Sequence, residues 1–553
     1  MLASLLPTQG FATTPTYVNH NTGWGTKESK KFYSHDQGSK LIDYSWLKAL
    51  KDPSGKPFLR DSLTRYGFIP NELDHKNILP IGFSHTGNDV GITCAACHTR
   101  QININGTAYR IDGGPALIDF QSFLSDLDIS VGNLISDTTK FEDFAIAVLG
   151  KKNSKSLKTK LKTQLTKWYE PSHVLMSRAL PINPWGVGRL DAVSMIFNRL
   201  TGLDIGEPQN GYMIPENIMP ADAPVRYPFI WNAPFQNKTQ WLGFASNGNN
   251  LAAMLRNQGE VFGVFGKFHP VFINGKIDYK KNNSTNYAGL KQLENLVTKI
   301  PPPKWTSVSD LPSLNPNLVA NGKKIFEANC YSGCHEKKID YQDLASYIIN
   351  VATFQPFRNT WVTPVKDVLT DTRQWSLPVR QVKTGVLQGE TIPFLNIKLK
   401  ETANSLDVLE VASYGAVIKD SVTLGWLHLV GEYFQQFFPV PTFPTTFPYE
   451  SRVLEGVWAA APYLHNGSVP NLRELLKPAS QRVASFDIGA DYDLQDVGIA
   501  IQQTLPYSTL NTTITSDCNT VRDDSGDSRC GHEFGTNLSD IDKDALLEYL
   551  KSL

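Results

Sequence analysis

The sequence contains the motif C-x-x-C-H, formed by Cys94, Cys97 and His98. This spacing attaches a c-type haem: the two thiols add to the vinyl groups of the porphyrin, and the adjacent histidine binds the iron as its fifth ligand. A thioredoxin-like redox pair would need a βαβ context, and a zinc site would need a second C-x-x-C. The sequence offers neither of these. The motif therefore predicts a covalently bound haem c.

A second motif, formed by Cys330, Cys334 and His335, has the spacing C-x-x-x-C-H and is one residue longer. The extra residue must loop out so that both sulfurs reach the porphyrin, and Gly333 permits such a backbone excursion at little cost. The alternative is a disulfide or an unmodified pair beside a chance histidine. Residues 318–326 have helical periodicity, as is common at the start of cytochrome c domains, and this favours a second haem c.

The remaining cysteines, Cys518 and Cys530, have no adjacent histidine at haem spacing. In an oxidising compartment, a disulfide between them would close the short polar loop that they bracket. Residues 1–12 look like the tail of a signal peptide, although a plain disordered terminus is the alternative. Because haem is attached covalently outside the cytoplasm in bacteria, we expect a periplasmic or secreted protein.

The length and the composition limit the fold and the partners. The formal net charge is zero, which argues against nucleic acid as a partner. No apolar run approaches the roughly eighteen residues of a membrane span, so we expect none. A chain of 553 residues exceeds what one core usually holds, and the proline-rich run 300–316 predicts a boundary. We predict a mainly α fold with two cytochrome c-type haem domains and long loop-rich insertions. Residues 1–300 would carry the active-site haem, and residues 301–553 the second haem.

The sixth ligand of each iron decides its chemistry. All six methionines lie at or before Met254, so the second haem has no local methionine to bind. The histidines after His335 are His428, His465 and His532, and two histidine ligands would set a low reduction potential. His428 lies in an apolar helix-like run and is expected in the core. His532 is favoured, because the Cys518 and Cys530 pair would pin its segment. His465 is the rival, or else a partner of a propionate or of the other domain.

The first haem has fewer candidate ligands. After His98 the next histidine is His173, and none lies between His173 and His269. Residues 181–250 are rich in proline, glycine, tryptophan and asparagine, which predicts loops that wall a cavity. An apolar pocket with an open sixth position favours binding of dioxygen or peroxide. The alternative is that His75, His85 or His173 folds back onto the iron.

Five stretches of the sequence, the first of which is the first cysteine motif, carry a resemblance. The chain resembles the bacterial di-haem cytochrome c peroxidase superfamily and, more narrowly, its rubber oxygenase branch, which includes enzymes that cleave polyisoprene and relatives that dioxygenate unsaturated fatty acids. The stretches are residues 94–99, 110–116, 231–241, 452–475 with its Ala461-Pro462-Tyr463-Leu464-His465-Asn466-Gly467 core, and 531–536.

The resemblance implies a mostly helical protein whose two cytochrome c domains face each other. It makes His98 the sole protein ligand of the active iron and gives the second iron His335 and His532. It places Trp231 between the haems and implies that an aromatic such as Phe244 shields the bound dioxygen. The superfamily's peroxidases also hold a calcium ion between the domains, to which residues near Ala460 and Pro462 could contribute.

Two departures separate this chain from those peroxidases. They have a His/Met haem in the C-terminal domain, which this chain cannot form locally. They also carry an inhibitory histidine after the first motif, and the matching position here is Gly114. Both differences argue against a peroxidase cycle with reductive activation.

Three functions remain open. The leading hypothesis is a dioxygenase that oxygenates or cleaves a carbon–carbon double bond of an apolar substrate, such as an unsaturated fatty acid or a polyisoprene. The second is a peroxidase that reduces hydrogen peroxide with electrons passed by a redox partner through the C-terminal haem. It would need a glutamate or glutamine over the first iron as a proton acceptor, and the sequence does not identify one. The third is an electron carrier with two six-coordinate irons.

Overall fold

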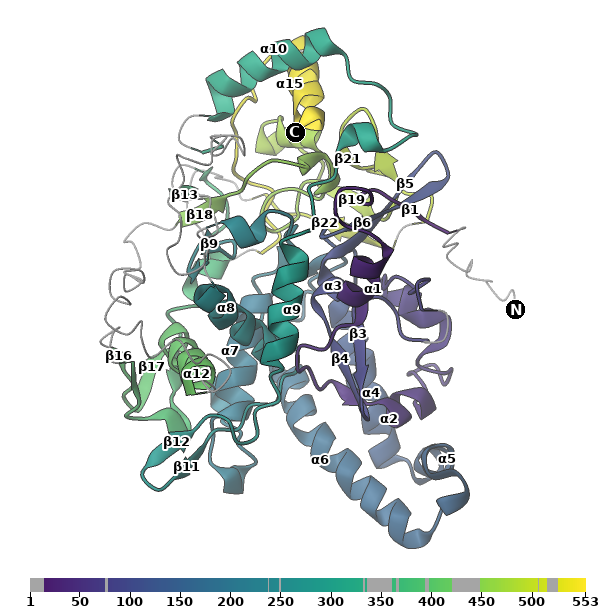
Figure 1. Cartoon of the computed structure of the whole chain (residues 1–553), viewed down its shortest axis with the longest axis vertical. Coiled ribbons are helices and arrows are strands. Elements are labelled where there is room, and N and C mark those ends of the chain that lie inside the picture. The colour runs from purple at the N-terminus through teal and green to yellow at the C-terminus, as the bar shows by residue number, and fades with distance from the viewer. Residues whose placement is uncertain are drawn as a thin grey trace.

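A computed structural model of the chain gives the fold (Figure 1). It describes residues 14–74, 78–236, 238–247, 250–331, 334–335, 361–364, 368–392, 397–419, 448–505, 507–514 and 526–553. Helices outweigh strands in these ranges, in keeping with the predicted mainly α class, and every strand belongs to a small sheet of two or three strands. None of the helices in these ranges is long and apolar enough to cross a membrane.

The helices are α1 (Thr26–Ser34), α2 (Tyr44–Ala49), α3 (Cys94–Cys97), α4 (Phe120–Ser136), α5 (Thr138–Leu149), α6 (Lys155–Ala179), α7 (Ala192–Arg199), α8 (Asn250–Gly263), α9 (Tyr287–Val297), α10 (Pro316–Phe326), α12 (Ser405–Lys419), α14 (Leu472–Leu475) and α15 (Asp540–Ser552). The strands are β1 (Thr16–Tyr17), β2 (Ile42–Asp43), β3 (Phe83–Thr86), β4 (Asp89–Ile92), β5 (Thr99–Ile104), β6 (Thr107–Asp112), β7 (Arg189–Leu190), β8 (Val225–Arg226), β9 (Lys238–Thr239), β10 (Ala245–Ser246), β11 (Val271–Ile273), β12 (Lys276–Asp278), β13 (Trp361–Pro364), β14 (Gln381–Lys383), β15 (Thr391–Ile392), β16 (Ile397–Lys398), β17 (Thr402–Asn404), β18 (Pro448–Ser451), β19 (Ser485–Ile488), β20 (Tyr492–Asp493), β21 (Gly498–Ile499) and β22 (Ser508–Asn511).

The first motif lies between two small sheets. Strand β4 pairs with β2 and β3 and leads into the one-turn helix α3, and β5 leaves it to pair with β6. The β5–β6 turn is made by Asn105 and Gly106, both at positive φ, as a two-residue hairpin whose twist matches its strands requires. Two sheets thus fix the entry and the exit of the short helix that carries the cysteines.

Helices α4, α5 and α6 form an arm at the lower end of the molecule (Figure 1). Their first turns are capped by side chains that accept from backbone N–H groups: Asp119, Asp137 and Ser154. Residues such as Leu127 of α4 and Leu165 of α6 bury their side chains in one apolar cluster, and this packing holds the arm together.

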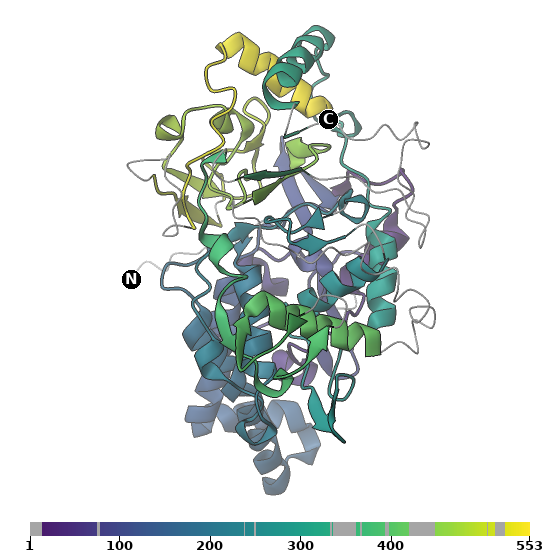
Figure 2. The same cartoon turned by 90° about the vertical axis from the view of Figure 1, so that its left-hand side faces the viewer.

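Segments from both sides of residue 300 build the region around α8. Helix α12 packs against α8 and α7, and residues 382–416 share an apolar cluster with residues 200–279 (Figure 2). The largest apolar cluster likewise runs from Val18 to Leu550. The boundary between residues 1–300 and 301–553, with one haem domain on each side, stays a prediction.

Helices α10 and α15 cross at the upper end of the molecule, next to the second motif (Figure 1). A Cβ atom at Gly322 of α10 would lie 1.9 Å from the carbonyl oxygen of Ala545 in α15, so only glycine permits this approach. Helix α10 confirms the helix expected over residues 318–326.

Candidate haem sites

The first motif forms one turn of helix that ends at its histidine. The backbone N–H of His98 donates to the carbonyl of Cys94 at 3.1 Å, four residues back. The His98 Nδ1 donates to the carbonyl oxygen of Pro228 at 2.9 Å, which fixes the ring and its tautomer and leaves Nε2 as the metal-binding nitrogen. Burial lowers the pKa of His98 to about 4, so the imidazole is neutral, as a metal ligand must be.

The two thiols of this motif are reduced and un-ionised. Neither Cys94 nor Cys97 is in a disulfide. Burial raises the pKa of both thiols, that of Cys97 to about 12. A nucleophilic cysteine needs a lowered pKa, whereas the sulfur of a thioether carries no charge. The chemistry of this turn therefore fits covalent haem attachment.

An ionic cluster that the sequence did not identify lies close to these thiols. Arg256 of α8 donates from Nη2 to Glu294 Oε2 at 2.7 Å, and its Nε lies 3.9 Å from Glu260 Oε1. The charge of Glu260 contributes to the raised pKa of both Cys94 and Cys97. Burial raises the pKa of Glu260 itself, although its side chain keeps 41% of its surface accessible. The only sequence signal for this cluster was the i, i+4 spacing of Arg256 and Glu260. Such pairs are common on the surfaces of helices, so the spacing alone does not indicate a functional site.

The two aromatic residues expected near the first iron differ in their surroundings. Trp231 is fully buried, stacks on Phe229 with ring centroids 4.6 Å apart, and donates from Nε1 to the carbonyl of Glu455 at 2.7 Å. Phe244 packs on the apolar cluster of α7 and on the cluster of Trp241. Neither of these clusters includes Cys94 or Cys97, and the role of Phe244 stays a prediction.

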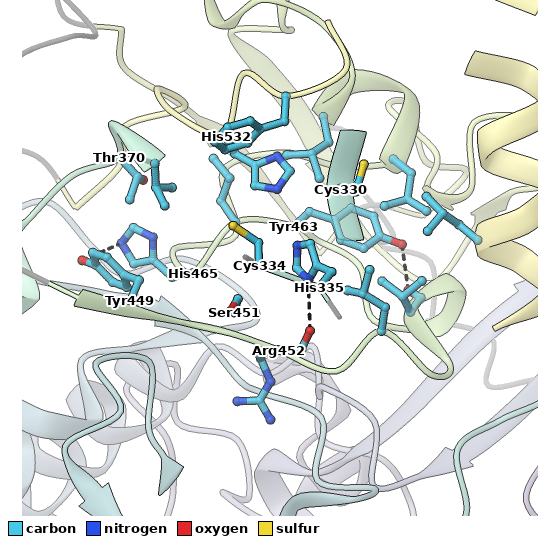
Figure 3. Close-up of a pocket in the computed structure, with 18 of the residues that line it drawn as sticks. Cys330, Cys334, His335, Thr370, Tyr449, Ser451, Arg452, Tyr463, His465 and His532 are labelled. Atoms are coloured by element: carbon cyan, nitrogen blue, oxygen red, sulfur yellow. Dashed lines mark hydrogen bonds between the residues drawn. The ribbon is translucent and has the colours of Figure 1, made fainter. Parts of the chain in front are cut away.

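The second motif closes its turn with a wider loop. The backbone N–H of His335 donates to the carbonyl of Cys330 at 3.1 Å, five residues back, and Cys330 lies in the π-helical turn Glu327–Tyr331. A π-type turn holds one residue more than an α-turn, so it absorbs the extra residue of the motif. Gly333, which was expected to permit this, lies outside the described residues. The His335 Nδ1 donates to the carbonyl oxygen of Arg452 at 3.2 Å (Figure 3).

His532 lies next to His335 across a cavity. The two ring centroids are 6.2 Å apart and the rings are inclined by 52° (Figure 3). Two imidazoles that bind one metal ion from opposite sides, each with a metal–nitrogen distance of about 2 Å, have centroids about 6 Å apart. The His532 Nδ1 is buried and has no hydrogen-bond partner within the described part of the chain. The pair therefore fits two axial ligands of one iron.

The backbone around His532 is tightly constrained. His532 itself has a φ of 54°, and its N–H donates to the carbonyl of Val368 at 2.7 Å. A Cβ atom on Gly531 would lie 2.6 Å from the same carbonyl, so glycine is required there. Cys530 is in a disulfide, while Cys518 lies outside the described residues. A non-glycine residue held at positive φ by its surroundings is typical of functional sites.

Part of this cavity wall matches a known family. Residues 448–487 match the family described as RoxA-like, cytochrome c-like. The match links the chain to the cytochrome c superfamily. Two relatives come from Sinorhizobium fredii (strain NBRC 101917 / NGR234). "Uncharacterized protein y4iJ" is 28% identical over 97% of this chain and 93% of its own length. "Uncharacterized protein y4iM" is 38% identical over 20% of this chain and 28% of its own length.

The cavity beside the matched segment is lined by both polar and apolar side chains. The polar ones include those of Arg226, Thr370, Tyr449, Glu450, Arg452 and His465; the apolar ones include Phe326, Leu472, Leu475, Leu546 and Leu550. Haem likewise combines polar and apolar parts, two propionates and an apolar porphyrin body. The residues present therefore fit a haem c attached through Cys330 and Cys334.

His465, the rival ligand, has polar partners of its own. Its Nε2 lies 3.3 Å from Asp371 Oδ2 and 3.4 Å from the hydroxyl of Tyr449. The ring beside His335 is that of His532. His428 and His75 lie outside the described residues. His85 stacks on Tyr44, and His173 binds Asp128 on the arm.

The carbonyl of Ala461, in the region proposed for calcium, is already used by a side chain. The buried guanidinium of Arg100 donates from Nη1 to the carbonyls of Ala461 and Pro115. No cluster of three or more histidine, cysteine, aspartate or glutamate side chains that could hold a metal occurs in the described ranges. Calcium would be bound by backbone and asparagine oxygens instead, and it stays a prediction.

Proposed function

We propose that the protein is a periplasmic or secreted di-haem c oxidoreductase that uses dioxygen to oxygenate or cleave a carbon–carbon double bond of an apolar substrate. One observation carries the proposal: the ring of His532 faces that of His335 with centroids 6.2 Å apart, whereas in the described part of the chain no other histidine or aromatic ring contacts that of His98. When bound, the first haem would supply an iron with an open position for dioxygen, and the second would exchange electrons.

The chain's own residues would prepare the first site. Pro228 holds the His98 ring through Nδ1, so Nε2 points to one place before any ligand arrives. Ala95 and Ala96 are buried next to the thiols and keep water from that side of the turn. Apolar side chains around Phe244, among them Val193, Phe197 and Leu377, would receive an alkene chain.

The test is oxygen uptake by the purified holoprotein. Oleate and a polyisoprene latex are supplied in turn, and products formed under ¹⁸O₂ are examined by mass spectrometry. We expect uptake with at least one alkene and incorporation of label from dioxygen. The saturated analogue stearate is the control and should give no uptake. Absence of uptake with every alkene, together with rapid peroxide turnover with a reduced cytochrome, would overturn the proposal.

One observation favours the peroxidase as the second candidate. Glu260 lies close enough to both thiols to raise their pKa, and burial raises its own pKa, which favours its carboxyl as a proton acceptor and donor. For a peroxidase, Glu260→Gln should abolish peroxide turnover. For the dioxygenase, the same substitution should leave uptake with the alkene largely intact.

The location and the electron supply belong to the same proposal. The disulfide at Cys530 supports an oxidising compartment, where covalent haem attachment also takes place. A redox partner would exchange electrons through the second haem. Reduction of that haem by a small external cytochrome, followed by its absorbance, checks this part separately.

A further inference from the structure

A short chain of hydrogen bonds connects the two histidines that follow the cysteine motifs. His98 Nδ1 donates to the carbonyl of Pro228 at 2.9 Å. The carbonyl of the next residue, Phe229, accepts from Arg452 Nη2 at 3.0 Å. The carbonyl of Arg452 accepts in turn from His335 Nδ1 at 3.2 Å (Figure 3). Through its side chain, Arg452 therefore contacts Phe229, the residue that follows the one whose carbonyl orients His98, and through its backbone carbonyl it orients His335.

The Arg452 side chain is held on several sides. It is 7% exposed, and its guanidinium lies 4.8 Å from the ring centroid of Phe229 and 5.4 Å from that of Trp241. Its Nη1 lies 3.2 Å from Glu450 Oε2. A guanidinium fixed in this way presents both its donors and its charge in one orientation.

The charge of Arg452 acts at both sites. At the first site, its Nη2 donates to the carbonyl of the residue next to Pro228, which holds the His98 ring. It also lines the cavity beside His335 and His532. Charges act strongly in a buried, low-dielectric region, and hydrogen bonds to the outer nitrogen of a ligand histidine tune the metal that it binds.

We propose that Arg452 is a positioning residue that couples the two haem sites. It fixes the orientation of the two ligand histidines, His98 and His335, and raises the reduction potential of both irons. This inference rests on the two haems of the proposed function but not on the substrate. A fixed positive charge favours the reduced iron, which carries one positive charge less, so both potentials depend on the same side chain.

Three matched substitutions separate this coupling from a general charge effect. Arg452→Gln removes the shared guanidinium. Arg226→Gln removes a buried guanidinium that lines the second cavity and donates to the carbonyls of Leu464 and Tyr227. Arg256→Gln removes a guanidinium of the ionic cluster near the first site, where it is paired with Glu294.

The readout is a spectroelectrochemical titration of each holoprotein without substrate, after its haems are counted. We expect R452Q to lower both midpoint potentials, R226Q to lower that of the second haem by more than that of the first, and R256Q to lower only that of the first. A shift at one haem alone in R452Q, or equal shifts at both haems in R226Q, would overturn the inference and leave the oxygenase proposal standing.

A second variant keeps the test decisive if R452Q fails to fold or to bind both haems. If R452Q does not accumulate with two haems, Arg452→Lys keeps the charge but loses the fork that reaches Phe229 and Glu450 together. It should lower both potentials by less than R452Q would, and a shift at only one haem contradicts the coupling. A single haem in the unaltered protein would overturn both proposals, which the haem count shows before any titration.

Discussion

The two cysteine motifs close in the same way despite their different lengths. In both, the histidine N–H donates to the carbonyl of the first cysteine at 3.1 Å, across four residues at Cys94 and five at Cys330. The turn is one residue wider in the second motif, yet its histidine N–H reaches the same acceptor, the carbonyl of the first cysteine. The two motifs thus share this hydrogen bond although their spacing differs.

What differs is the opposite side of each histidine. His532 faces His335 from a backbone constrained by positive φ and by Gly531. Within the described residues no other ring contacts that of His98, and the ionic cluster of Arg256 and Glu260 lies close to the thiols of its motif. The two motifs form similar turns in different surroundings, which favours different roles: catalysis at the His98 site and electron transfer at the His335 site.

The largest effect should follow from removing the histidine of the site proposed for chemistry. We expect His98→Ala to lower oxygen uptake by more than about 100-fold, because even partners behind a ligand histidine are worth about 10- to 100-fold. The electrode assay measures this. His85→Ala, at an exposed histidine stacked on Tyr44, is the control and should keep its activity. If His98→Ala retained uptake, the roles of the two sites would have to be exchanged.

The next effect tests the facing histidines directly. His532→Ala should open the second iron, so that reduced protein binds carbon monoxide at two irons instead of one. His465→Ala, at a histidine paired with Asp371, should bind it at one. Carbon monoxide titration followed by absorbance counts the sites. Two binding sites in His465→Ala and one in His532→Ala would assign the ligand to His465.

A smaller effect, on thermal stability, is expected from a change in helix α10, which leads into the second motif. The first motif is preceded by strand β4 instead. Gly322→Ala would place a methyl group 1.9 Å from the Ala545 carbonyl and should cost about 1–3 kcal/mol by overpacking. Gly259→Ala in α8 meets only Leu409 at 3.6 Å and is the control. Thermal unfolding followed at haem and far-ultraviolet wavelengths should show a lower Tm for Gly322→Ala only. Equal Tm values would mean that α10 and α15 separate easily.

The smallest effect, on the number of bound haems, is expected when the second motif is shortened to the length of the first. Deletion of Ser332 converts the second motif to C-x-x-C-H, and we expect two haems per chain as before, because the closing bond can form across four residues. A pyridine haemochrome assay gives the count. Loss of one haem would show that the longer turn is itself required.

The sequence predicted the parts of the sites that depend on local patterns. Both motifs, the helix before the second one and the disulfide at Cys530 follow from spacing or periodicity over short stretches. His532 was favoured over His465 because the Cys518 and Cys530 pair would pin its segment, and its ring lies beside that of His335.

The remaining features depend on contacts between distant segments, which no local pattern records. Helix α12 packs on α8 although more than 140 residues separate them. Glu260 of α8 likewise lies close to the thiol of Cys94, which is far from it in the sequence. Arg452 was noticed as part of a signature, but its link to Phe229 spans 223 positions. Such pairings arise from the tertiary arrangement and not from residue type alone.

The bridge made by Arg100 has a practical consequence for where the protein can work. Its guanidinium joins the carbonyls of Pro115 and Ala461, and although burial lowers its pKa to about 10, it stays protonated at neutral pH. A chelator cannot strip this cation away. The contact between these two distant stretches should therefore persist in media poor in divalent ions, such as those rich in citrate or phosphate.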